Sequence, residues 1–222
     1  MKATPTTVDY GKLRLSNLFS EQYRHILLLL YWPVYGFVFW YAEQVHPVDY
    51  YFPMYCKLDD LIPFNELFVI PYLLWFVFLI GMQVYTFFAD VPVFKQMLKF
   101  VILTYTTALV IFFLFPNCQE LRPQVFPRDN ILTRFMAGFY EFDTNTNVCP
   151  SLHVIGSLGS MFAAWKAKGL QAKGFKIAAF ILAFFISIST VFLKQHSILD
   201  VFVALPICAI GYFLCFRQSK CK

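Results

Sequence analysis

The chain has 222 residues, of which 59% are hydrophobic, 20% are aromatic and only 14% are charged. This composition is too apolar and too poor in charge for the surface of a soluble domain of this length. The net charge of +5 does not indicate a nucleic-acid partner, because the Lys and Arg residues are scattered at the ends of apolar stretches. We therefore predict an all-α integral membrane protein.

The first stretch of the chain, residues 1–24, is polar and mildly basic. It has no short apolar core followed by a small-residue cleavage site, so it does not resemble a removable signal peptide. We interpret it as a short amphipathic leader on the cytoplasmic membrane surface. The membrane domain is then expected over residues 25–216, and a short cytoplasmic tail over residues 217–222.

Six apolar stretches follow, each long enough to cross roughly 30 Å of hydrocarbon as a helix. The fourth is the least hydrophobic, because it contains His153, two Gly and two Ser residues. Small and polar residues are favoured where a helix is shielded from lipid by other helices. The sequence therefore predicts six transmembrane helices, near residues 25–45, 65–89, 94–115, 151–168, 174–194 and 197–216.

Basic residues predict the orientation of these six helices. An even number of crossings leaves both termini on one side, and 13 of the 18 Lys and Arg residues fall on that side. Because basic residues concentrate on the cytoplasmic side of membrane proteins, we expect a multi-pass protein of the cell membrane with both termini in the cytoplasm. The loop after the third span is then extracytoplasmic.

That loop, residues 116–150, is the longest polar connection in the chain. Its residues 130–142 are amphipathic enough for a short interfacial helix capped by Asp129 or Asn130. Cys118 and Cys149 flank the loop on the same side of the membrane, so a disulfide between them is one hypothesis. The six Cys residues otherwise have neither a disulfide framework nor zinc-binding spacing.

Three extracytoplasmic elements carry residues that suit phosphate chemistry: Arg122-Pro123, the Pro150–His153 segment, and Lys194 with His196 and Asp200. The four-residue step from His196 to Asp200 places imidazole and carboxylate on one face of a helix. A Pro at the start of the fourth span leaves the first backbone N–H groups unpaired, which favours an anion there. We expect these elements to converge on one phosphate-binding site.

In order and spacing, these residues resemble the three motifs of the type 2 phosphatidate phosphatase superfamily. The matching segments are Arg122-Pro123, Pro150-Ser151-Leu152-His153, and Ser189 with His196 and Asp200. The family has Gly where Leu152 stands, and the Leu variant is similar to the inositol phosphorylceramide synthase branch. The chain also has Phe115 and Thr190 where the family has Lys and Arg. Lys194, Arg128 and Arg134 are the local substitutes for the missing cations, and Lys194 is favoured.

The resemblance implies a metal-independent enzyme without a cofactor that acts on a lipid phosphate through a phosphohistidine. His196 would be the nucleophile, Asp200 would orient it, and His153 would act as general acid and base. Arg122, Ser151 and Lys194 would stabilise the phosphoryl oxygens. His25 and His46 lie outside the motifs, and we expect them at the membrane interface.

Four functions stay open at this stage. We favour hydrolysis of a polyprenyl diphosphate or a phosphatidate-type lipid, because water needs no acceptor pocket. Head-group transfer of the inositol phosphorylceramide synthase type is the alternative. A metal hydrolase would use His153, His196 and Asp200 as ligands, although nearby cations would repel the ion. A non-enzymatic lipid-binding or transport protein would not need two titrating His side chains.

Overall fold

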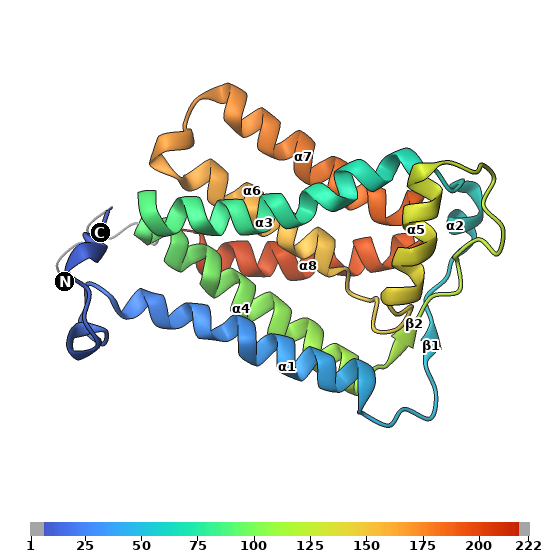
Figure 1. Ribbon diagram of the computed structural model, residues 1–222, viewed down its shortest axis with the longest axis horizontal. Helices are drawn as coiled ribbons and strands as arrows, with labels where there is room; N and C mark the ends of the chain where they lie inside the picture. Colours follow the sequence, from blue (N-terminus) through green and yellow to red (C-terminus); the bar gives the residue numbers. More distant parts are fainter. Residues whose placement is uncertain (1–6, 218–222) are drawn as a thin grey trace.

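The computed structural model describes residues 7–217, so most of the predicted tail and the first six residues of the leader lie outside the described residues. The chain folds into a bundle of long helices with one end covered by short elements (Figure 1). Within the described residues the only sheet is a pair of two-residue parallel strands. The all-α prediction is therefore confirmed.

Five helical segments are long and apolar enough to cross a membrane. The first joins a 3-10 segment to α1, and the second joins another 3-10 turn to α3. Their bounds are Arg24–Leu30 with α1 (Tyr31–Gln44), Glu66–Phe68 with α3 (Val69–Ala89), α4 (Val91–Leu114), α7 (Lys173–Phe192) and α8 (Ile198–Cys215). These match five of the six predicted spans to within about three residues.

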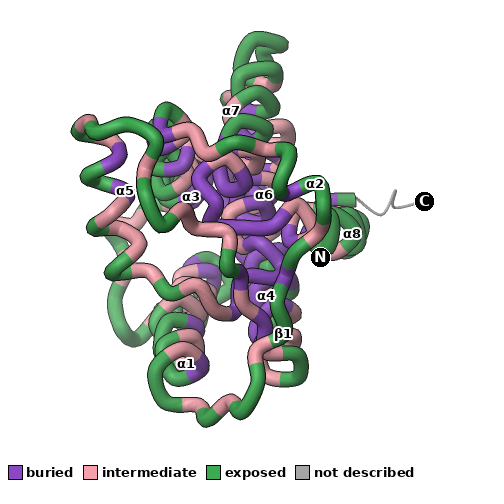
Figure 2. Tube along the Cα trace, turned by 90° about the vertical axis from the view of Figure 1, so that its right-hand side faces the viewer, coloured by how far each residue is buried: buried purple, intermediate pink, exposed green. Residues whose placement is uncertain are grey.

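The predicted fourth span, 151–168, is represented by α6 (Leu152–Lys166), which has only 15 residues. At 1.5 Å per residue it is about 22 Å long, shorter than the hydrocarbon core of a bilayer. Nine of its residues are buried, and it lies among the other helices (Figure 2). A Cβ on Gly156 would meet Trp75 and Tyr105 at 2.7 Å, and one on Gly159 would meet Phe100 at 2.7 Å. The small residues thus let α3 and α4 approach α6 closely.

Short elements cover the end of the bundle at which α6 and α8 begin. In Figure 1, α5 (Ile131–Phe142) runs across this end, at a steep angle to the long helices. Asn130 caps α5 by accepting hydrogen bonds from the backbone N–H groups of Leu132 and Thr133, as one of the two predicted caps. The other elements here are α2 (Lys57–Leu61), β1 (Phe52–Pro53) and β2 (Asn117–Cys118).

The described chain begins and ends at the opposite end of the bundle (Figure 1). The described part of the leader forms two single 3-10 turns, Tyr10–Lys12 and Leu15–Asn17. The Tyr10 hydroxyl group lies 2.8 Å from His25 Nε2 and donates to the Phe87 carbonyl group. His25, which we expected at the interface, is therefore a buried packing residue.

Candidate active site

The turn between α7 and α8 presents the imidazole of His196. Helix α7 ends at Phe192, Lys194 adopts a left-handed conformation with φ 53°, and the amides of Gln195 and His196 both donate to the Thr190 carbonyl. Asp200 Oδ2 lies 3.0 Å from His196 Nδ1 and accepts a second hydrogen bond from the Ser197 amide. The predicted pairing of His196 with Asp200 is present, with the imidazole just before the helix and the carboxylate in its first turn.

The second imidazole, His153, comes from the first turn of α6. Its ring lies 4.4 Å from each of the rings of Tyr72 and Trp75, both on α3, and 5.7 Å from the ring of His196. The buried Nε2 atom of His153 has no hydrogen-bond partner in the described part of the protein. The structure therefore brings the two predicted catalytic His residues together, one from the first turn of α6 and one from the α7–α8 turn.

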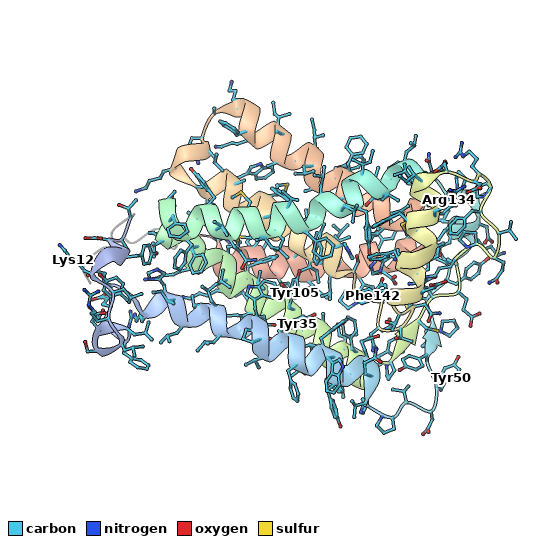
Figure 3. All side chains as sticks on the ribbon, in the orientation of Figure 1. Lys12, Tyr35, Tyr50, Tyr105, Arg134 and Phe142 are labelled. Carbon is cyan, nitrogen blue, oxygen red and sulfur yellow. The ribbon has the colours of Figure 1, made fainter. Side chains whose placement is uncertain are left out.

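Both imidazoles line a cavity of about 300 Å³. One wall is polar and comes from the α6 start, the α7–α8 turn and the loop after α5, while the other is aromatic and comes from α1, α3 and α4. In Figure 3, Tyr35 and Tyr105 lie between α1 and α4, and Phe142 lies at the end of α5 nearest to them. The lining residues are Trp32, Tyr35, Phe39, Tyr72, Trp75, Phe76, Tyr105, Phe139, Phe142, Asp143, Thr144, Thr146, Asn147, Val148, Leu152, His153, Gln195 and His196.

Several buried polar atoms of this lining have no partner within the described protein. Besides His153 Nε2 they are the Tyr35 hydroxyl, Trp75 Nε1 and Asn147 Oδ1. Buried polar atoms are nearly always hydrogen-bonded in native proteins, so such a group of exceptions in one cavity calls for an explanation. A bound polar ligand is one explanation, because it would pair with these atoms and would fit the chemistry of the two imidazoles.

Ser151 joins the two halves of the site. Its side chain caps α6 by accepting from the Val154 amide at 3.5 Å, and its own amide donates to the Asp200 carbonyl at 3.3 Å. The Ser151 N–H is therefore not free for an anion, contrary to our expectation. The N–H groups of Leu152 and His153, in the first turn of α6, have no partner within the helix.

Arg122 lies behind the cavity wall and is held by oxygen atoms on several sides. It donates to the carbonyl groups of Tyr140, Asp143 and Thr144 at 2.8–2.9 Å, and to Gln195 Oε1 at 2.7 Å. Burial lowers the pKa of Arg122, and the Asp143 carboxylate, 3.8 Å away, opposes that shift. Arg122 thus fixes the loop after α5 against Gln195, which itself lines the cavity.

Asp143 brings a carboxylate into the same wall. Gln195 Nε2 donates to its Oδ2 atom at 3.2 Å. Burial raises the pKa of Asp143, and the positive charge of Arg122 partly offsets this. The carboxyl group is therefore easier to protonate than that of an exposed Asp.

The three substitutes proposed for the missing motif cations have other partners. Lys194 Nζ donates to the Asp59 carbonyl at 2.6 Å and lines a separate cavity of about 720 Å³. Arg128 pairs with Glu66 at 2.8 Å. Arg134 pairs with Asp129 at 2.8 Å on the exposed start of α5, at the outer edge of the molecule in Figure 3. No Lys or Arg of the described chain lines the His153–His196 cavity.

Asp59, in α2, was not predicted as part of the site. Its buried carboxylate accepts from the Ser197 hydroxyl at 2.7 Å and from the amides of Ile198 and Cys56 at 2.8 Å. It therefore fixes the first turn of α8, which carries Asp200. Asp59 lies about 140 residues before its partners and in no motif, so local sequence contained no signal for this contact.

Neither a disulfide nor a metal-binding cluster is found in residues 7–217. Cys118 and Cys149 are both free thiols, so the hypothesis of a bridge between them is wrong for this structure. No group of three His, Cys, Asp or Glu side chains is arranged to hold a metal ion. The arrangement instead offers one imidazole oriented by a carboxylate and a second imidazole opposite it.

Comparison with known proteins identifies the family. The family model of the PAP2 superfamily matches residues 96–221, more than half of the chain. The chain belongs to the PAP2 superfamily. Members of the PAP2 superfamily are phosphatases and phosphotransferases, which supports a hydrolase-type enzyme acting on phosphoesters. No curated protein and no solved structure matches the chain.

The match to the PAP2 superfamily includes all three predicted motifs, and it starts after α1 and α3. Those two helices nevertheless contribute a third of the residues that line the cavity, among them Tyr35 and Trp75. The family match therefore covers the polar part of the site, and most of the aromatic part lies outside it.

Proposed function

We propose that this PAP2 protein is a membrane phosphatase that hydrolyses a lipid mono- or diphosphate through a phosphohistidine at His196. The observation that carries the proposal is the pairing of His196 Nδ1 with Asp200 at 3.0 Å inside the cavity that His153 shares. Because Nδ1 is engaged by the carboxylate, Nε2 is the nitrogen left to attack phosphorus. Asp200 also stabilises the positive charge that develops on the ring.

In the first step, the His196 Nε2 lone pair forms a P–N bond while the bond from phosphorus to the lipid oxygen breaks. The leaving oxygen takes a proton from His153. In the second step, His153 removes a proton from water, whose oxygen attacks phosphorus and breaks the P–N bond. Inorganic phosphate leaves, and both imidazoles return to their starting state.

The negative charge of the phosphoryl group must be stabilised without Lys194, because Lys194 lines another cavity. We assign the nearest charge stabilisation to the two imidazoles and the first N–H groups of α6, with Arg122 acting from behind Gln195. The Arg122 side chain is only 17% exposed, and electrostatic interactions at such a site are stronger than in bulk water. Ser151 then contributes by fixing the start of α6.

We further propose that α6 also crosses the membrane, which makes six spans in all. We propose that the active site faces the extracytoplasmic side. The distribution of basic residues supports this orientation, and so does the start of α6, which lines the cavity and lies toward the bundle end opposite to the described chain ends (Figure 1). Labelling of the partly exposed Cys118 by a membrane-impermeant thiol reagent in intact cells tests it. Labelling that requires permeabilised cells would contradict it.

Head-group transfer is the second candidate, and the side chains that line the cavity favour it. The polar wall contains Thr144, Thr146, Asn147 and Gln195, which are neutral groups able to bind hydroxyl groups of an acceptor alcohol. Leu152, in place of the family Gly, also lines the cavity and excludes water beside His153. The same residues would then pass the phosphoryl group to an alcohol oxygen.

One assay tests the proposal against this second candidate. The purified protein is given prenyl, glycerol and sphingoid lipid phosphates, with and without polyol acceptors, and both free phosphate and new phosphodiester are measured. We expect free phosphate to dominate, and activity to persist in the presence of a chelator. A product dominated by phosphodiester supports transfer, and activity restored only by zinc or magnesium supports a metal hydrolase.

A further inference from the structure

An apolar groove adjoins the catalytic cavity. It has a volume of about 580 Å³ and lies between α3 and the segment formed by α1 with its preceding 3-10 turn. The groove and the catalytic cavity share Trp32, Trp75 and Phe76 in their linings. The two spaces therefore adjoin each other, and the imidazoles lie in the catalytic one.

The floor of the groove is a straight stripe along α3. Pairs of adjacent lining residues begin at Trp75, Leu79, Gln83 and Phe87, so the pattern repeats every four residues on one face of the helix. From Trp75 to Phe88 the stripe is about 20 Å long at 1.5 Å per residue. Half of a bilayer hydrocarbon core is about 15 Å, so the stripe can accommodate the chain of a lipid from one leaflet.

The lining of the groove is almost entirely apolar, and aromatic rings lie at its far end. Gln83 is the one polar side chain in its lining, and its Oε1 atom accepts a hydrogen bond from Trp32 at 2.7 Å. At the far end, the ring of Phe87 stacks on Tyr10 at 4.8 Å and contacts Phe94 at 5.1 Å. A hydrocarbon chain is thus offered a dry surface along the groove and a block of aromatic rings at its end.

We propose that this groove binds one hydrocarbon chain of the substrate while the phosphate lies between His153 and His196. The inference rests on the proposed function and adds the part of the site that selects the lipid. The lining that it shares with the catalytic cavity distinguishes the groove from an ordinary lipid-facing surface, because a phosphorylated lipid with its phosphate between the imidazoles has its chain beside the groove. The aromatic rings at the far end predict a preference for chains of about one leaflet in length.

A pair of variants on α3 tests the proposal. Val84 lines the groove and is 51% exposed, whereas Val77 is 66% exposed on the same helix and does not line it. Each is replaced by Trp, and kcat/KM is measured for hexadecyl phosphate and for butyl phosphate. In Val84→Trp the ratio of the two values falls at least about tenfold, because lost burial of two methylene groups is already worth that much. In Val77→Trp the ratio stays as in the unmodified protein. A similar ratio in all three proteins would overturn the proposal.

A binding experiment separates this proposal from the proposed function, because it needs no turnover. Hexadecyl phosphate with a photoreactive diazirine at the chain end is added to the protein in phosphatidylcholine vesicles, and labelled residues are identified by mass spectrometry. We expect label within residues 79–88, reduced in Val84→Trp and weaker for the matched hexadecanol probe. Equal labelling by the two probes, label on other helices, or crosslinks between two protein copies would each contradict the groove assignment. If labelling succeeds and no lipid phosphate is turned over, the proposed function fails alone.

Discussion

The two walls of the catalytic cavity differ in how they are held. The polar wall is fixed by hydrogen bonds: Asp200 holds His196, Ser151 ties α6 to α8, and Arg122 holds Gln195. The aromatic wall, from α1, α3 and α4, is held mainly by ring contacts, such as that of Tyr35 with Tyr105 at 5.2 Å. Hydrogen bonds fix direction and ring contacts fix shape, so the polar wall suits bond breaking and the aromatic wall suits recognition of an apolar chain.

This difference predicts that substitutions in the two walls affect different properties of the enzyme. Changes in the polar wall should lower turnover of every substrate, because they affect the reacting groups. Changes in the aromatic groove should alter the ranking of substrates by chain length. The following variants of the polar side test the first half of this division.

The largest effect is expected for His196→Ala. Loss of the attacking imidazole should lower kcat on the order of 10⁴-fold or more for every lipid phosphate, whatever its chain. His46→Ala is the matched control, because His46 contacts Tyr41 and Phe113 outside the cavity. Phosphate release by purified variants measures the effect. Near-normal turnover in His196→Ala would refute its role.

A smaller loss is expected for His153→Asn. Removing the acid and base should lower kcat by about 10²- to 10⁴-fold, and less for substrates whose leaving group needs no proton. The measurement compares a lipid phosphate with nitrophenyl phosphate, whose nitrophenolate leaving group needs no proton. An equal loss on both substrates would show that His153 does not protonate the leaving oxygen.

Asp59→Asn tests the support of the α8 start. Both carboxylate oxygens accept hydrogen bonds from donors, so an amide NH₂ group must face one of them. We expect a destabilisation of about 1–3 kcal/mol. A fall in kcat of about ten- to a hundredfold should accompany it, because the reacting group is displaced. Thermal unfolding and turnover are measured in parallel with Asp60→Asn, a change at an exposed position on α2. Unchanged turnover in Asp59→Asn would limit Asp59 to the fold.

The smallest effect is expected for the loop cations. Arg122→Lys removes most of four hydrogen bonds that a planar guanidinium makes at once, so kcat/KM should fall about tenfold. Arg134→Lys and Arg128→Lys, which pair with carboxylates elsewhere, should change it less than about twofold. Equal effects of the three changes in the same assay would remove Arg122 from the site.

The polar wall was the more predictable of the two. His-x3-Asp spacing and a Pro-Ser segment before a helix are local patterns, so the proximity of His153, His196 and Asp200 could be predicted from the sequence, and their catalytic roles stay predictions. The partners of Lys194 and Arg128 could not be predicted, because Asp59 and Glu66 are distant from them in the chain. Hydropathy located the five long helices well. It overestimated the length of α6, whose small residues serve packing within the bundle.

The aromatic wall was not predicted, because Phe, Tyr and Trp also form lipid-facing surfaces and interfacial belts. Spacing along α3 does not say which of its faces meets α1. The groove required the arrangement of α1 and α3 in space.

The central claim is the covalent step at His196, and rapid quenching tests it most directly. The protein is mixed with a lipid phosphate labelled on phosphorus, quenched with base within the first turnover, and digested for mapping. We predict an acid-labile, base-stable phosphoryl adduct on Nε2 of His196 that is retained in His46→Ala and absent from His196→Ala. A wild-type protein that turns over the substrate with no adduct, or with the adduct on another residue, would contradict the account.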